Sequence, residues 1–238
     1  SDVWLSYAAG EPVLKGISLR VAPGEKVALV GATGAGKTSI ISALCRFYDV
    51  QSGSVRIDGI DVREWDKRTL RRHLGLVLQD VFLFSGDIAR NISLGDPAIS
   101  DAQMVEAARR VHAQGFIDRL PGGLRAVVEE RGSTLSQGER QLLSFARALA
   151  FDRPILIMDE ATSSVDTATE LLIQDALRAL LLGRTALIIA HRLSTIQFVD
   201  RIIVLHKGRI REEGTHQELL AYGGLYSRLY ELQYQPLA

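Results

Sequence analysis

The sequence is poor in cysteine, since Cys45 is the single one among 238 residues. One thiol cannot form a disulfide within the chain or a zinc site built from cysteines, and we therefore expect a reducing compartment. Cys45 lies in an apolar stretch with helical spacing, which indicates a small core residue rather than a reactive thiol.

Net charge and long apolar runs are also missing. Lysine plus arginine and aspartate plus glutamate both number 28, so the formal net charge is zero. This balance argues against a nucleic-acid partner, which normally meets a clear basic excess. No run approaches the roughly 20 apolar residues that span a bilayer, and we expect neither a spanning helix nor a signal peptide. Work at a membrane would need another segment or another chain to cross it.

Apolar runs with the character of strands alternate with amphipathic stretches. The alternation at Val55 and Ile57, closed by Asp58-Gly59, predicts a strand that ends in a tight turn. Further strands are predicted at Val3–Tyr7, Ile17–Val21, Val27–Val30, Ile155–Met158 and Ala186–Ala190, with a hairpin from Arg201 to Ile210. This order predicts an α/β fold with a mainly parallel central sheet.

Two segments have the pattern of a helix start. Ser100 followed by Gln103 fits a capping box before apolar residues at helical spacing. Thr167 followed by Glu170 repeats the pattern, and we expect Thr167 to be the residue that caps this helix.

The strand pattern disappears from about Val81 to Ala150, which predicts a helical subdomain inserted into the chain. We therefore expect one domain over residues 1–238. Its core would comprise roughly residues 1–80 and 151–238, and its helical subdomain roughly residues 81–150.

A glycine-rich stretch follows directly on the predicted strand Val27–Val30. Residues 31–38 read Gly-Ala-Thr-Gly-Ala-Gly-Lys-Thr, a full match to the phosphate-binding loop of nucleotide-hydrolysing proteins. Glycines let such a loop wrap around a phosphate with its N–H groups turned inward. Lys37 would reach the β and γ phosphates, and the Thr38 hydroxyl would bind Mg2+. The candidate nucleotide-binding residues here are Gly31, Thr33, Gly34, Ala35, Gly36, Lys37, Thr38 and Ser39.

Two carboxylates, Asp159 and Glu160, follow the apolar run Ile155–Met158. The carboxyl ends of parallel strands are where open α/β sheets bind ligands. Asp159 would hold Mg2+, and Glu160 would polarise the water that attacks the γ-phosphate. The alternative, two acids that leave a core strand for solvent, is weaker because the phosphate-binding loop is present.

The stretch Leu135-Ser136-Gln137-Gly138-Glu139, here called the signature segment, resembles the Leu-Ser-Gly-Gly-Gln signature of ABC ATPases. The resemblance implies a P-loop NTPase core with an N-terminal antiparallel β subdomain and an inserted α-helical subdomain. It also implies a head-to-tail dimer, in which Ser136 and Gly138, at a helix N-terminus, reach the γ-phosphate bound by the partner domain. ATP and Mg2+ are the implied cofactors.

Further matches to this family extend over the whole chain. Tyr7 resembles the aromatic residue that stacks on adenine, and Gln79 the glutamine that touches Mg2+ and senses the γ-phosphate. Asp166 ends the stretch Ser163–Asp166, which is similar to the loop that couples the two sites of the dimer. His191 resembles the switch histidine, and it joins Glu160 and Lys37 in the implied catalytic set.

Two stretches resemble exporters of the multidrug and lipid type. Residues 129–132 look like the loop that touches the coupling helices of the transmembrane domains, and residues 81–86 suit a docking groove for such a helix. We therefore expect the C-terminal part of a longer exporter, at the cytoplasmic face of a plasma or inner membrane. The alternative function is a non-transport ABC ATPase that acts on nucleic acid or ribosomes.

The signature segment departs from the family pattern at two positions. Gln137 replaces a glycine and Glu139 replaces a glutamine. Gln137 restricts a backbone that must approach phosphate, and Glu139 adds negative charge near that anion. One interpretation is a heterodimer with two unequal sites, and the other is variation without consequence in a homodimer.

Overall fold

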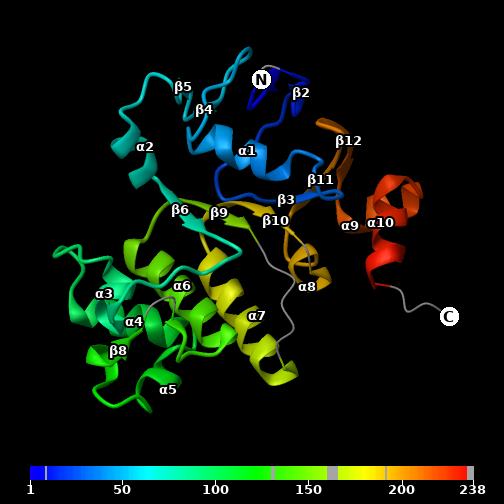
Figure 1. The fold of residues 1–238 in the computed structure, drawn as a ribbon. Helices are drawn as coiled ribbons and strands as arrows, with labels where there is room; N and C mark the ends of the chain where they lie inside the picture. Colours follow the sequence, from blue (N-terminus) through cyan, green and yellow to red (C-terminus); the bar gives the residue numbers. More distant parts are fainter. Residues whose placement is uncertain (9, 130–131, 160–165, 191, 235–238) are drawn as a thin grey trace. The chain divides into compact units, whose positions relative to one another are not determined.

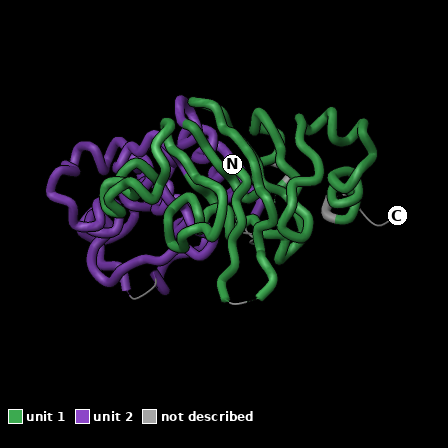
Figure 2. The backbone as a smooth tube through the Cα atoms, turned by 90° about the horizontal axis from the view of Figure 1, so that it is seen from above, with its two compact units in different colours: residues 1–74, 157–160, 185–238 green, residues 75–156, 161–184 purple. Residues whose placement is uncertain are grey.

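The computed structural model describes the chain apart from residues 9, 130–131, 160–165, 191 and 235–238 (Figure 1). The described chain divides into two compact units, which Figure 2 colours green and purple. Unit 1 comprises residues 1–74, 157–160 and 185–238, and unit 2 comprises residues 75–156 and 161–184.

Unit 1 holds most strands of the main sheet together with two short antiparallel pairs. Strands β6 (Leu74–Val77) and β9 (Ile155–Asp159) have residues in both units. The other elements of unit 1 are β1 (Val3–Leu5), β2 (Leu14–Ile17), β3 (Lys26–Val30), α1 (Lys37–Leu44), β4 (Arg56–Ile57), β5 (Ile60–Asp61), α2 (Lys67–Arg72), β10 (Thr185–Ile189), α8 (Leu193–Ile196), β11 (Arg201–His206), β12 (Arg209–Gly214), α9 (His216–Tyr222) and α10 (Leu225–Tyr234).

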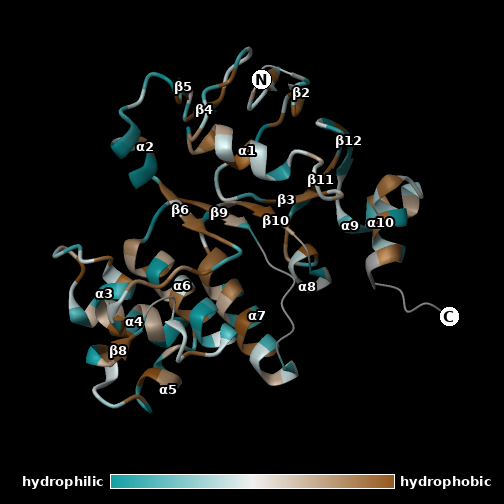
Figure 3. Ribbon diagram, in the orientation of Figure 1, coloured by the Kyte–Doolittle hydropathy of each residue, from teal (hydrophilic) through white to brown (hydrophobic). Residues whose placement is uncertain are grey.

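In the described part of the chain, the main sheet has six strands in the order β12-β11-β3-β10-β9-β6. Strand β3 pairs in parallel with β10 and with β11, so that Val27 lies opposite Leu187 on one side and Arg201 on the other. Strand β12 pairs antiparallel with β11, as the predicted hairpin requires. Strands β3 and β10 consist mostly of apolar residues (Figure 3), which is typical of parallel strands covered on both faces. The predicted α/β fold with a mainly parallel sheet is confirmed.

Strands β1 and β2 form the expected antiparallel pair at the N-terminus, with Leu5 opposite Leu14 and Val3 opposite Ile17. The predicted strand Ile17–Val21 is wrong, because the strand begins at Leu14 and ends at Ile17. Leu14 and Ile17 are the buried residues of β2, at 0% and 4% exposure. Pairing with β1 therefore determines where β2 begins and ends, and the alternation of apolar and polar residues after Ile17 does not.

The predicted turn at Asp58-Gly59 is confirmed. It joins β4 to β5, with Ile57 opposite Ile60. Asp58 and Gly59 have φ angles of 49° and 83°. Two successive positive φ angles are what a two-residue hairpin turn of this twist requires.

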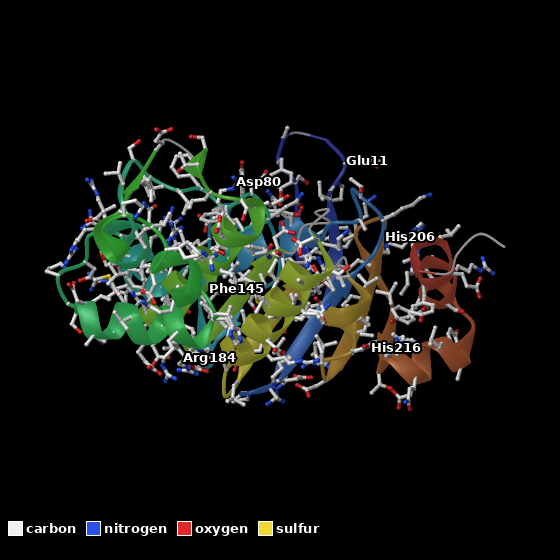
Figure 4. All side chains as sticks on the ribbon, turned by 90° about the horizontal axis from the view of Figure 1, so that it is seen from below. Glu11, Asp80, Phe145, Arg184, His206 and His216 are labelled. Atoms are coloured by element: carbon white, nitrogen blue, oxygen red, sulfur yellow. The ribbon has the colours of Figure 1, made fainter. Side chains whose placement is uncertain are left out.

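Unit 2 is mainly helical. Its longest helices are α6 and α7, and Phe145 of α6 is 1% exposed (Figure 4). The Arg147 guanidinium of α6 donates to the carbonyl oxygens of Asn91 at 2.8 Å and Phe82 at 3.2 Å, and burial lowers its pKa. The elements are β7 (Gly86–Asp87), α3 (Ile88–Ser93), α4 (Asp101–Arg110), α5 (Gln114–Ile117), a 3-10 turn (Gly123–Arg125), β8 (Val127–Val128), α6 (Gln137–Phe151) and α7 (Thr167–Leu181).

The two predicted helix starts in unit 2 have different outcomes. The capping box of Ser100 and Gln103 is present at the start of α4. The expected cap at Thr167 is wrong: Asp166 caps α7, because its carboxylate accepts from the backbone N–H of Thr169 at 3.0 Å. The pair β7–β8, two residues per strand, also lies inside the segment that we expected to lack strands.

Replacing Leu29 with alanine tests whether the sheet is the stability core of unit 1. Leu29 is fully buried in β3, so its truncation should lower the free energy of unfolding by about 2–5 kcal/mol in urea. Leu232 of α10 is 83% exposed, and Leu232→Ala is the matched control with a change below about 0.5 kcal/mol. Equal losses in the two variants would contradict this placement of the core.

Candidate functional site

The phosphate cradle, defined as residues 31–38, lies between β3 and α1 in unit 1. Gly36 is the N-cap residue of α1, and among the described residues no side chain caps this helix. The first N–H groups of a helix have no partner inside the helix and carry positive potential. The start of α1 thus presents unpaired donors to an anion, which is the arrangement that phosphate-binding loops use.

Gly31 shows why the cradle takes this course. Its φ angle is +154°, and a Cβ placed there would collide with the backbone carbonyl oxygen of Leu205 on β11. The chain leaving β3 therefore passes against the neighbouring strand at a distance that admits a glycine alone. Parallel pairing of β3 with β11 then fixes where the cradle begins.

Lys37 reaches back into the cradle from the first position of α1. Its ammonium donates to the carbonyl oxygens of Gly31 at 2.6 Å and Ala32 at 3.1 Å. The residue is 7% exposed, and this burial lowers the pKa of Lys37, while the negative charge of Asp159 counteracts the effect. A desolvated ammonium of this kind gains strongly from an anion that arrives beside it.

Asp159 is the last residue of β9 and belongs to unit 1, as Thr38 does. Thr38 is exposed at the second position of α1. No group of three or more acidic, histidine or cysteine side chains that could hold a metal is found among the described residues. A hydroxyl and one carboxylate do fit Mg2+, which takes one or two protein ligands and completes its shell with phosphate oxygens and water.

Tyr7 lies two residues beyond β1 and 47% of it is exposed. Its hydroxyl donates to the Ser39 hydroxyl oxygen at 2.9 Å, so the predicted base-stacking residue touches the helix of the cradle. Two side chains that the sequence did not single out lie against this segment: Tyr48 and Gln51. They follow α1 in the sequence, and no local pattern links them to Tyr7.

The signature segment lies in unit 2, where Ser136 is the N-cap residue of α6, as predicted. Glu139 closes a capping box: its carboxylate accepts from the Ser136 N–H at 2.9 Å, and its own N–H donates to the Ser136 hydroxyl at 3.2 Å. The carboxylate that departs from the family pattern thus occupies a backbone donor at this helix end. The starts of α1 and α6 differ in this respect.

Gly138 is buried where α6 meets α7. A Cβ at Gly138 would overlap the methyl carbon of Thr169. The hydroxyl of Thr169 donates to Asp166 at 2.6 Å, and the hydrogen bonds from Thr169 lower the pKa of Asp166. Gly138 of the signature segment therefore packs against Thr169, which in turn is hydrogen-bonded to Asp166.

The predicted site residues fall into three sets. In unit 1 the structure brings together Tyr7, the cradle, Ser39 and Asp159, while unit 2 contains Gln79, exposed after β6, with Ser136, Gly138 and Asp166. The predicted catalytic residues Glu160 and His191 lie outside the described residues, as do residues 163–165 and 130–131. Of the other histidines, His216 of α9, labelled in Figure 4, is bonded through its Nδ1 to the Tyr226 hydroxyl at 2.6 Å.

The protein-family model described as ABC transporter matches residues 14–163. The chain is 53% identical over 232 residues to a probable multidrug resistance ABC transporter ATP-binding/permease protein, YheH, of Bacillus subtilis, covering 98% of this chain and 34% of that protein. It is 50% identical over 223 residues to the ATP-dependent lipid A-core flippase of Chromobacterium violaceum, covering 94% of this chain and 38% of the flippase.

Among solved structures, a bacterial Atm1-family ABC exporter with ATP bound matches the whole chain with a TM-score of 0.92 and 43% identity. The match covers 41% of that exporter chain. The chain thus spans between about a third and two fifths of the length of the relatives it matches.

Replacing Gly138 with alanine tests the packing of Gly138 against Thr169. The new methyl group would overlap the Thr169 methyl, so we expect a loss of about 1–3 kcal/mol in the free energy of unfolding. Adding Thr169→Ser, which removes that methyl and keeps the hydroxyl on Asp166, should recover most of the loss. Additive effects of the two substitutions in urea unfolding would count against the contact.

Proposed function

Because the chain belongs to the ABC transporter family, we propose that it is the ATP-binding and ATP-hydrolysing motor domain of an exporter. The observation that carries the proposal is the cradle, in which uncapped helix N–H groups and a desolvated Lys37 converge. This arrangement favours a triphosphate over a neutral ligand. In this proposal residues 1–80 and 151–238 form the catalytic core, and residues 81–150 form the helical subdomain.

Hydrolysis would divide between groups that hold the phosphates and groups that activate water. Lys37 would leave its two carbonyl partners for the β and γ phosphates, because an anion stabilises an ammonium better than neutral carbonyls do. Thr38, Asp159 and Gln79 would hold Mg2+, which supplies positive charge against the phosphate oxygens. Glu160 would orient and polarise the attacking water, and His191 would contact the γ-phosphate.

The partner would be a second nucleotide-binding domain in a head-to-tail dimer. Ser136 and Gly138 at the start of α6 would then close on the ATP of that partner. Glu139 opposes this role here, since its negative charge lies beside the Ser136 N–H and repels phosphate. We therefore infer a heterodimer, in which this chain hydrolyses ATP beneath the more favourable signature of a different partner.

The membrane domain would dock on residues 81–86 of unit 2. Phe82 and Phe84 are each about half exposed, and their rings pack edge to face with centroids 4.9 Å apart. The Asn91 side chain fixes the backbone of Phe84, since it accepts from the Phe84 N–H and donates to the Phe84 carbonyl oxygen, both at 2.8 Å. A rigid, exposed aromatic pair suits the apolar face of a coupling helix.

The proposed location is the cytoplasmic face of a plasma or inner membrane. Along the described residues, no helix is long and apolar enough to cross a membrane. The name of the relative YheH, an ATP-binding/permease protein, gives ATP binding and permease function to one polypeptide. No observation favours the alternative function on nucleic acid or ribosomes.

Replacing Lys37 with alanine tests the nucleotide site without requiring a partner. We expect ATP to bind about 10- to 100-fold more weakly in calorimetric titration, because a charge-assisted contact to phosphate is lost. Lys67, exposed at the start of α2, supplies the control Lys67→Ala, which should bind ATP as the original chain does. Unchanged ATP affinity in Lys37→Ala would contradict the proposed site.

A mixing experiment tests the roles of Glu160 and the signature segment together. The helper chain carries Glu160→Gln with Gln137→Gly and Glu139→Gln, so that it offers the family signature and cannot activate water. Adding it to the unmodified chain should raise phosphate release per unmodified molecule at least about tenfold, because the unmodified site gains an additional phosphate-binding helix end.

The control helper carries Glu160→Gln alone and keeps the original signature segment. It should stimulate phosphate release little. Equal stimulation by both helpers would show that the departures at Gln137 and Glu139 have no consequence, and the heterodimer would lose its support.

A further inference from the structure

The side chain of Gln51 is bonded to the backbone of Ser6 at both of its polar ends. Its Oε1 accepts from the Ser6 N–H at 2.7 Å, and its Nε2 donates to the Ser6 carbonyl oxygen at 3.0 Å. A side-chain amide placed in this way makes the same two hydrogen bonds as a residue of a neighbouring strand. Ser6 directly precedes Tyr7. These two hydrogen bonds therefore fix the backbone just before Tyr7.

The backbone of the same segment continues this pairing along β1. The Gln51 N–H donates to the carbonyl oxygen of Trp4 at 3.0 Å, and the Trp4 N–H donates to that of Ser52 at 3.1 Å. The ladder of β1 with β2 ends at Leu5. Gln51 therefore extends the ordered backbone of β1 beyond its last regular pair, to the residue before Tyr7.

Tyr48 holds the ring of Tyr7. The two ring centroids are 4.7 Å apart and the rings are nearly perpendicular, at 80°. This is a preferred geometry of aromatic pairs. The Tyr7 hydroxyl is bonded to Ser39 at the opposite end of the side chain, yet about half of Tyr7 stays exposed. The Tyr7 side chain is thus held at three points: through the backbone of Ser6, by the Tyr48 ring and through its own hydroxyl. Part of the Tyr7 ring nevertheless stays exposed.

We propose that Gln51 and Tyr48 are positioning residues that hold the Tyr7 ring ready to stack on the adenine base of ATP. The proposal rests on the proposed nucleotide site. A ring that is already held in place loses little conformational freedom when the base arrives, so its contribution to affinity is retained. Residues 48–51 begin four residues after the end of α1, the helix of the cradle, and they would couple the position of the base surface to that of the phosphate site.

The alternative is that both residues merely stabilise unit 1. The two roles differ in which ligand they affect. A positioning role concerns the base and should weaken ATP, whereas inorganic tripolyphosphate, which carries the phosphates without a base, should bind as before. A general loss of structure would weaken both ligands together.

The test measures dissociation constants of ATP and of tripolyphosphate for Gln51→Leu and Tyr48→Leu. Each variant should bind ATP about three- to tenfold more weakly, the size expected for the lost hydrogen bonds or ring contact. The ratio of ATP affinity to tripolyphosphate affinity should fall by the same factor. Tyr48→Phe keeps the ring and should recover most of the ATP affinity.

Gln217, exposed on α9 of the same unit, supplies the matched control Gln217→Leu, in which the ratio should stay as in the original chain. An unchanged ratio in both Gln51→Leu and Tyr48→Leu, or an equal loss for both ligands, would overturn the positioning role. If the unmodified chain binds neither ATP nor tripolyphosphate, the proposed function itself fails, which is a distinct result.

Discussion

The close passage of the chain at Gly31 against the Leu205 carbonyl of β11 is the constraint on which the site of unit 1 depends. Because β3 lies between β10 and β11 in parallel register, the end of β3 turns into α1 close against β11. That course brings the uncapped start of α1 and the buried ammonium of Lys37 to the same place. Sheet geometry thus produces the proposed phosphate site before any ligand is present.

The starts of α1 and α6 use the same physics with opposite outcomes. Helix α1 leaves its first N–H groups without a side-chain cap, beside a cation. Helix α6 is closed by Glu139, whose carboxylate takes the Ser136 N–H. One end is prepared to receive an anion, and the other is partly neutralised by its own side chain. The negative charge that Glu139 brings to the start of α6 is the physical basis of the two unequal sites that we infer.

The sequence pattern predicted correctly those elements that depend on neighbouring residues alone. Strand β3 and the Asp58-Gly59 turn follow from burial and from turn chemistry. Strand β2 was misplaced because its pairing with β1 outweighs the alternation after Ile17. At α7 the carboxylate of Asp166 caps the helix one residue before Thr167. The hydrogen bonds between Gln51 and Ser6 join positions 45 residues apart, so no window of sequence could have shown them. The spacing of residues 31–38, by contrast, was enough to predict the cradle.

We infer that this chain binds ATP well and requires a different partner to hydrolyse it. The most direct test measures phosphate release from Mg-ATP over a wide range of protein concentration, with ATP binding determined on the same samples. We expect tight ATP binding with negligible turnover at every protein concentration. Turnover per molecule that rises with protein concentration would contradict it, because the chain would then form working sites with itself.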